Sequence, residues 1–259
     1  MASRLDGVTL KIERAKCHYY SVQEFVEDFT KEAFQGVLRR EFDSQSGEHR
    51  VELVEVKHPG DALGILIGDL LHNARSALDH LAFQLVHHPT VDPGVPKAKD
   101  CDIAFPICDS PKAFKSAVKK IQGAAPDALT AIERLQPYCV RQDAPERVTL
   151  SLLRELNDWD KHRLLHTAEN YVAEIGFAHS GRLESSEVHP PGVLEKGAEL
   201  ASWKVRPGLD PKVDVGFYIA SGVTFDQGPA SRENVLELLS RVLNDTFLTI
   251  ATLSQYVAA

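Results

Sequence analysis

The side chains best suited to chemistry lie on one predicted helix, between Asp61 and His87. Its polar positions lack the lysine and glutamate that normally cover a solvated helix, since neither occurs between His58 and Pro96. At about 100° per residue, six polar side chains fall within an arc of roughly 120°. They are Asp69, His72, Asn73, Ser76, Asp79 and His80. Such a face suits a cleft, a buried hydrogen-bond network or a phosphate site.

An arginine and a histidine of this helix have the chemistry to act on a phosphodiester. Arg75 lies at the edge of the polar face, and His80 follows five positions later. Because imidazole titrates near neutral pH, His80 could serve as general base or acid toward a ribose 2′-hydroxyl or the leaving oxygen. The Arg75 guanidinium would hold the phosphate and stabilise charge on its equatorial oxygens. Asp79 could pair with Arg75 or orient a partner.

The spacing of Arg75 and His80, with four residues between them on a helix, resembles the motif of the HEPN superfamily. Many members are metal-independent ribonucleases that act as dimers, with two motifs facing one cleft. The resemblance implies an endoribonuclease that works by 2′-hydroxyl attack on RNA, as a homodimer, with no cofactor and no metal. Ser76 departs from the motif, which usually has asparagine there.

A second polar block, residues 157–163, follows the leucines of another predicted helix. Asp160 falls on the leucine side, which predicts a buried carboxylate that needs a partner such as Arg75, Lys161 or a histidine of the first helix. With residues 71–80 and 105–107, this block resembles a family of uncharacterised bacterial proteins. That resemblance covers most of the chain and implies no activity. The supporting site residues that we predict are His72, Asn73, Ser76, Asp160, Lys161 and His162.

Two other functions compete with the ribonuclease. In the first, the polar residues form a structural network, or they line a cleft for a small ligand or a protein partner, and the protein is not an enzyme. In the second, side chains from two facing helices form the centre of a metal-dependent hydrolase, as helical bundles allow. Its candidate ligands are His72, Asp79, His80, His162 and His166.

Composition narrows these choices. The chain has 259 residues, 43% of them hydrophobic, and a net charge of -8. The negative charge disfavours broad nucleic-acid binding but leaves room for a local basic site. One side of the predicted helix 110–121 is basic and suits either solvent or phosphate; it carries Lys112, Lys115, Lys119 and Lys120. Without a signal peptide or a membrane-spanning run, we expect a cytoplasmic protein that contacts no membrane.

The expected fold is a single α+β domain, mainly α, in which a helical bundle carries an inserted β-hairpin at about 35–56 and further strands before the C-terminal helix. The predicted helices span 8–34, 61–87, 110–121, 127–136, 147–166 and 231–256. Asp61 and Ser231 are the predicted caps of two of them. The predicted strands outside the hairpin span 103–107, 171–177 and 213–219. The polar segment 179–196 is predicted to be a mobile insertion.

Overall fold

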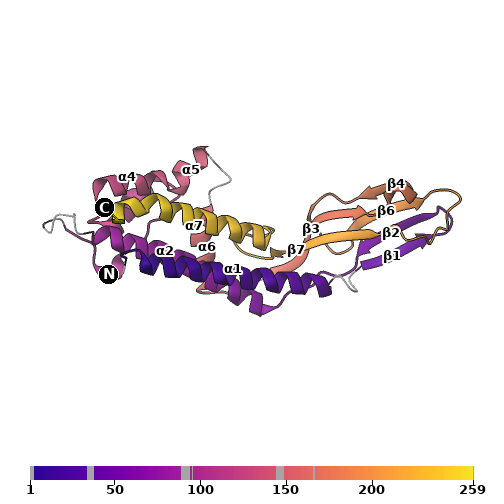
Figure 1. Cartoon of the computed structure of the whole chain (residues 1–259), viewed down its shortest axis with the longest axis horizontal. Coiled ribbons are helices and arrows are strands. Elements are labelled where there is room, and N and C mark those ends of the chain that lie inside the picture. The colour runs from indigo at the N-terminus through magenta and orange to yellow at the C-terminus, as the bar shows by residue number, and fades with distance from the viewer. Residues whose placement is uncertain are drawn as a thin grey trace.

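An elongated molecule emerges, in which a helical body carries a β arm at one end (Figure 1). This computed structural model describes residues 3–33, 38–88, 94, 96–143, 149–165 and 167–258. The body contains α1 (Asp6–Ala33), α2 (Asp61–Val86), η1 (Asp100–Asp102), α3 (Pro111–Ala117), η2 (Val118–Ile121), α4 (Pro126–Arg134), α5 (Pro137–Asp143), α6 (Thr149–Asp160) and α7 (Val235–Ala258). The predicted α+β class, mainly α, is confirmed, with the hairpin inside 35–56 and strands before the last helix.

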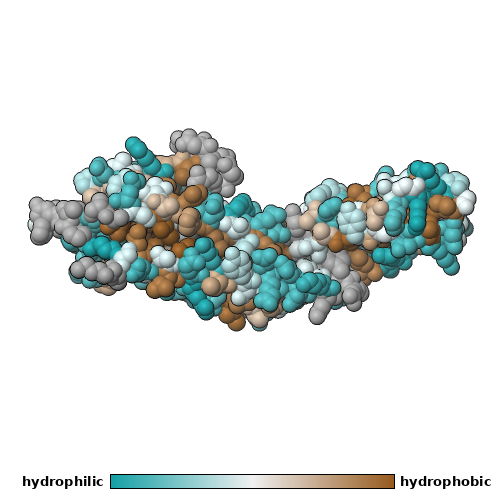
Figure 2. Space-filling model, in the orientation of Figure 1, coloured by the Kyte–Doolittle hydropathy of each residue, from teal (hydrophilic) through white to brown (hydrophobic). Residues whose placement is uncertain are grey.

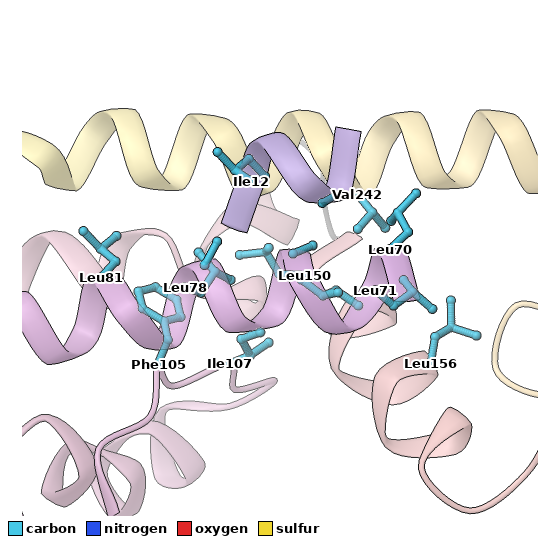
Figure 3. Close-up of a cluster of buried hydrophobic side chains, with 14 of the residues drawn as sticks. Ile12, Leu70, Leu71, Leu78, Leu81, Phe105, Ile107, Leu150, Leu156 and Val242 are labelled. Carbon is cyan, nitrogen blue, oxygen red and sulfur yellow. The ribbon is translucent and has the colours of Figure 1, made fainter. Parts of the chain in front are cut away.

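The long helix α2 forms the centre of the body because half of its residues, 13 of 26, are buried. Fully buried positions recur every three or four residues along it, as the sequence predicts: Leu63, Ile67, Leu70, Ala74, Ala77, Leu81 and Leu85. Figure 3 shows this face meeting residues of α1, α6 and α7, among them Ile12, Leu150 and Val242. Figure 2 shows apolar residues gathered over the body. Among the described helices, none is long and apolar enough to cross a membrane.

Several predicted helix ends need correction. Gly60, with φ of 84°, is the N-cap of α2, and Asp61 is its first helical residue. The predicted helix 147–166 stops at Asp160, and the N–H groups of His162 and Arg163 both bond the carbonyl oxygen of Trp159 in its last turn. The prediction did not include α5, which begins at a proline, a residue that fits the first turn of a helix.

The β arm consists of two antiparallel sheets with their own hydrophobic cluster, separate from that of the body. One sheet has the order β1-β2-β6-β4 and the other β5-β3-β7. The strands are β1 (Leu38–Asp43), β2 (Glu48–Leu53), β3 (Thr167–Phe177), β4 (Leu183–Val188), β5 (Gly192–Val193), β6 (Glu199–Val205) and β7 (Phe217–Phe225). Val51 and Leu53 face the cluster, and the pairing of β2 with β6 shifts register between Val51 and Glu52.

Parts of the arm differ from the predicted strands. The last strand spans 217–225 instead of 213–219, and β6 was not predicted. Segment 179–196 contains a 3-10 turn at Ser180–Arg182 together with β4 and β5. Its mobility and the single-domain assignment stay predictions.

The cap of α7 gives a first testable prediction. Asn234 Oδ1 accepts the N–H of Glu237 at 3.1 Å, whereas the predicted cap, Ser231, donates its hydroxyl to Asp226 O at 3.2 Å. Loss of a capping side chain typically costs about 1 kcal/mol. We expect Asn234→Ala to lower the free energy of unfolding by about 1 kcal/mol in urea denaturation, against less than about 0.5 kcal/mol for Ser231→Ala. Equal effects of the two substitutions would contradict this assignment.

Candidate functional site

The peptide segment 105–108 is held in place by side chains rather than by a neighbouring strand. Arg75 Nη2 donates to Phe105 O at 2.7 Å, and Asp79 Oδ1 accepts the Phe105 N–H at 2.8 Å. Arg75 also donates to both oxygens of Asp79, at 2.8 and 3.3 Å. The two side chains therefore take the place of a neighbouring strand beside Phe105. The predicted strand 103–107 is wrong, since these residues belong to no sheet.

The next peptide groups are bound on alternate sides. Gln136 donates to Pro106 O at 3.0 Å and accepts the Cys108 N–H at 2.9 Å. Arg154 Nη1 donates to Ile107 O at 2.9 Å. The carbonyls of 105 and 107 thus accept from arginines, while the carbonyl of 106 and the N–H of 108 bond Gln136. This alternation is typical of an extended chain.

A pocket of about 440 Å³ lies between this segment, α2, α6 and the basic helix that ends in η2. It brings together residues from all three blocks that the sequence analysis singled out, namely 71–80, 105–107 and 157–163. The polar side chains that line it are His72, Arg75, Ser76, Asp79, Lys120, Arg154, Asn157, Asp158 and Lys161.

The lining is more positive than the protein as a whole. Four cationic side chains and two carboxylates line the pocket, although the chain has a net charge of -8. Two of the cations are paired within the lining: Arg75 with Asp79, and Lys161 with Asp158 at 2.8 Å. Outside the lining, Arg154 reaches Asp109 at 2.7 Å. Lys120 is exposed and forms no ion pair within the described part of the chain.

Three polar groups at the pocket have no hydrogen-bond partner among the described residues. The Asn157 side chain is only 5% exposed, lines the pocket and bonds to none of them. The Ile107 N–H, on the edge that faces the two arginines, is likewise unbonded, as is Nη1 of Arg75. The Asn157 and Arg75 side chains have no fully buried atom without a partner, so these groups are open to the pocket, where a ligand or water can bind them. The sequence alone gave no sign of the Ile107 N–H.

The structure brings together only part of the predicted site. His72, Arg75, Ser76, Asp79 and Lys161 share the pocket. Four other predicted residues do not line this pocket: His80, Asn73, Asp160 and His162.

His80 lies on a different face of α2 from Arg75, because residues five positions apart lie about 140° apart around a helix. Its ring is exposed and faces the start of α1, where a Cβ built on Gly7 would lie 2.8 Å from Nδ1. Asn73 turns back along its own helix, donating to Asp69 O at 2.8 Å. His162 is exposed and lines a neighbouring pocket beside Trp159, which shares Asp158 with the first.

Asp160 packs against the backbone of α2, where a Cβ built on Gly68 would lie 2.5 Å from both carboxylate oxygens. Neither Arg75 nor Lys161 is its partner, since these residues pair with Asp79 and Asp158. Burial, reinforced by the nearby Asp69, raises the pKa of the Asp160 carboxyl, while His72 acts in the opposite direction.

The raised pKa of Asp160 means that its charged form lowers the free energy of unfolding. Its carboxylate costs the folded state free energy once the pH rises above the unfolded value of 3.8, and the full cost applies above the folded pKa. We therefore expect Asp160→Asn to raise the melting temperature at pH 7 and to leave it unchanged below pH 3.8, as measured by calorimetry. A lower melting temperature at pH 7 would show that the charged form is stabilised.

The metal alternative finds no donor arrangement in the described part of the chain, where no group of three or more histidine, cysteine, aspartate or glutamate residues could hold an ion. His166, one of its candidate ligands, lies outside the described residues.

Two cationic side chains of the pocket, Arg154 and Lys120, could have been found from patterns in the sequence. The prediction missed Arg154, yet it precedes Asn157, Asp158 and Lys161 by three, four and seven residues, the spacing of one helix face. Lys120 belongs to the basic side noted on the helix 110–121.

The fold and site thus define a mainly helical protein with a β arm and a polar, cation-lined pocket. No family model, curated protein or solved structure matches the chain.

Proposed function

We propose that the pocket between α2, α6 and segment 105–108 binds a phosphate-bearing small ligand. The observation that carries this proposal is the meeting of four cationic side chains with the unbonded amide of Asn157, a residue that is 5% exposed, in one pocket of an acidic protein. Anions bound by proteins are held by arginine, lysine and backbone N–H groups, all of which line this pocket.

The unbonded donors define where the phosphate oxygens would lie. Arg75 Nη1 and the Ile107 N–H both lack partners among the described residues, and Lys120 is free of carboxylates there. Asp79 holds Arg75 and the 105 peptide in fixed positions, so these donors are arranged before the ligand arrives. The carboxylate of Asp158 could accept hydroxyl groups of the same ligand.

Calorimetric titration with inorganic phosphate and with adenosine monophosphate, at constant ionic strength, tests the proposal. We expect one saturable site, weakened about tenfold by Lys120→Gln and by Arg154→Gln. Arg163→Gln is the matched control, because Arg163 is exposed and stacks on Trp159 outside the pocket. We expect Lys120→Gln to leave the fold intact, since the lysine is exposed. The absence of saturable binding, or equal weakening by Arg163→Gln, would overturn the proposal.

A second candidate is a HEPN-like, metal-independent ribonuclease, for which this pocket would hold the scissile phosphate of RNA. It is favoured by one observation: the exposed imidazole of His72 shares the pocket with Arg75. In this candidate a base takes the 2′-hydroxyl proton, and O2′ bonds to phosphorus. The 5′-oxygen leaves with a proton from an acid, and a 2′,3′-cyclic phosphate remains. A homodimer in the cytoplasm would bring one histidine from each subunit to the same phosphate. The catalytic histidine of each subunit would be either His72, which lines the pocket, or His80, which has the HEPN-like spacing from Arg75.

Incubation with mixed RNA in excess EDTA separates the two candidates. Cleavage that is lost in Arg75→Ala and in either His72→Ala or His80→Ala supports the ribonuclease and identifies its histidine. Phosphate binding without cleavage, by correctly folded protein, assigns the pocket to ligand binding alone.

A further inference from the structure

The far end of the β arm contains a second pocket, of about 330 Å³, formed by residues from both sheets. Arg40 of β1, His49 of β2 and Trp203 of β6 come from one sheet, and Phe217 of β7 comes from the other. The loop that contains Lys212 completes the wall. This end of the arm points away from the helical body (Figure 1), so the pocket is separate from the one described above.

Stacked aromatic rings make the wall of this pocket rigid. The Trp203 ring stacks with His49 at 5.0 Å and 6° and with Phe217 at 5.8 Å and 16°. His49 is fixed in turn, because its Nε2 lies 2.8 Å from Pro211 O. The Arg40 guanidinium lies over the Phe217 ring, 5.5 Å from its centre. Such stacking holds a cation in place without neutralising it.

The pocket offers donors that no described residue uses. Trp203 is 6% exposed, and its indole N–H, a donor only, bonds to none of them. Among the described residues, neither Arg40 nor Lys212 has a carboxylate partner within 4.0 Å.

The two carboxylates in the lining are partly engaged elsewhere. Glu41 pairs with Arg39 at 3.1 Å, and Asp214 Oδ1 accepts the N–H of Gly216 at 2.8 Å. Arg39 thus neutralises Glu41, whereas Asp214 keeps its charge. Arg40 and Lys212 together outweigh that one charge, and neither has an ion pair among the described residues.

We propose that the arm pocket is a second anion site, in which Arg40, Lys212 and the Trp203 indole N–H hold the phosphate or carboxylate group of a small organic molecule. This inference does not depend on the function proposed for the first pocket. Guanidinium, ammonium and indole groups all donate and none accepts, so an oxyanion satisfies the three together.

Tryptophan fluorescence gives a direct test, because the chain has only two tryptophans, Trp159 and Trp203. In a Trp159→Phe background, Trp203 is the sole reporter. We titrate it with inorganic phosphate and with acetate at constant ionic strength. A saturable change in emission is expected with at least one of them, and the probe that saturates identifies the ionic group.

Matched variants assign that signal to the pocket. Arg40→Gln and Lys212→Gln should each weaken binding about tenfold. Arg50→Gln should change it less than twofold, because Arg50 pairs with Glu48 and neither residue lines the pocket. Arg154→Gln, in the first pocket, should leave the Trp203 signal unchanged. No saturable response to either probe, or an equal response in Arg40→Gln and the parent protein, would overturn the proposal.

Discussion

Replacing Arg75 by alanine is expected to lower the free energy of unfolding by about 3 kcal/mol and to abolish phosphate binding. The guanidinium, only 17% exposed, bonds both oxygens of Asp79 and the carbonyl oxygen of Phe105. Without it, a partly buried carboxylate and a carbonyl lose their partner, and hydrogen bonds to charged groups contribute about 1.5–3 kcal/mol each. The peptide that forms the wall of the pocket then loses one of its two anchors on α2.

A double-mutant cycle separates this interaction from a general loss of packing. Arg75→Ala, Asp79→Ala and the double variant should show a coupling of at least about 1 kcal/mol in urea denaturation. Arg39→Ala removes an arginine whose carboxylate partners lie on the arm surface, and it should cost less than about 1 kcal/mol. Additive effects of the two pocket substitutions would contradict the role assigned to the pair.

Replacing Gly64 by alanine is expected to destabilise the protein by about 2 kcal/mol, although alanine is the better helix former. Helix propensity alone predicts a gain of about 1 kcal/mol. However, a Cβ at this position would lie well inside contact distance of the carbonyl oxygen of Leu165, a buried residue. Backbone atoms cannot turn aside as a flexible side chain can, and overpacking costs typically about 1–3 kcal/mol.

Gly181→Ala provides the control, because no atom lies within 4 Å of a Cβ built there. Calorimetry should show a clear drop in melting temperature for Gly64→Ala and almost none for Gly181→Ala. A stabilised Gly64→Ala variant would mean that the chain after α6 does not pack on α2 as described.

The sequence predicts most of the helical body because its helices bury one continuous face. In α2, apolar residues recur with a period that no strand or loop produces, so its limits were placed within one residue. The end of α6 could not be predicted in this way. Leu164 continues the apolar period, and only the turn of the chain back onto Gly64 of α2 stops the helix at Asp160. The pairing of β2 with β6 joins residues about 150 positions apart, which local patterns do not encode.

In the candidate site too, features that depend on one helix were predictable and those that depend on tertiary contacts were not. Local spacing correctly placed Arg75 and Asp79 on one side of a helix, because their positions depend on α2 alone. The sequence does not tell which of the polar residues around that helix meets α6 and segment 105–108. The structure puts His72 there and leaves His80 facing α1. The position of the unbonded Ile107 N–H depends on three side chains from distant parts of the chain, so no motif could reveal it.

Amide NMR spectroscopy during a phosphate titration tests the central claim most directly. If phosphate binds in the pocket, the Ile107 N–H resonance and the Asn157 side-chain amide should shift together along one saturable curve, with the Arg75 and Arg154 guanidinium signals following it. The Gly181 amide, far along the arm, should not move. Saturable shifts confined to other residues, or an Ile107 amide that stays in place at saturating phosphate, would contradict the claim that this pocket is an anion site.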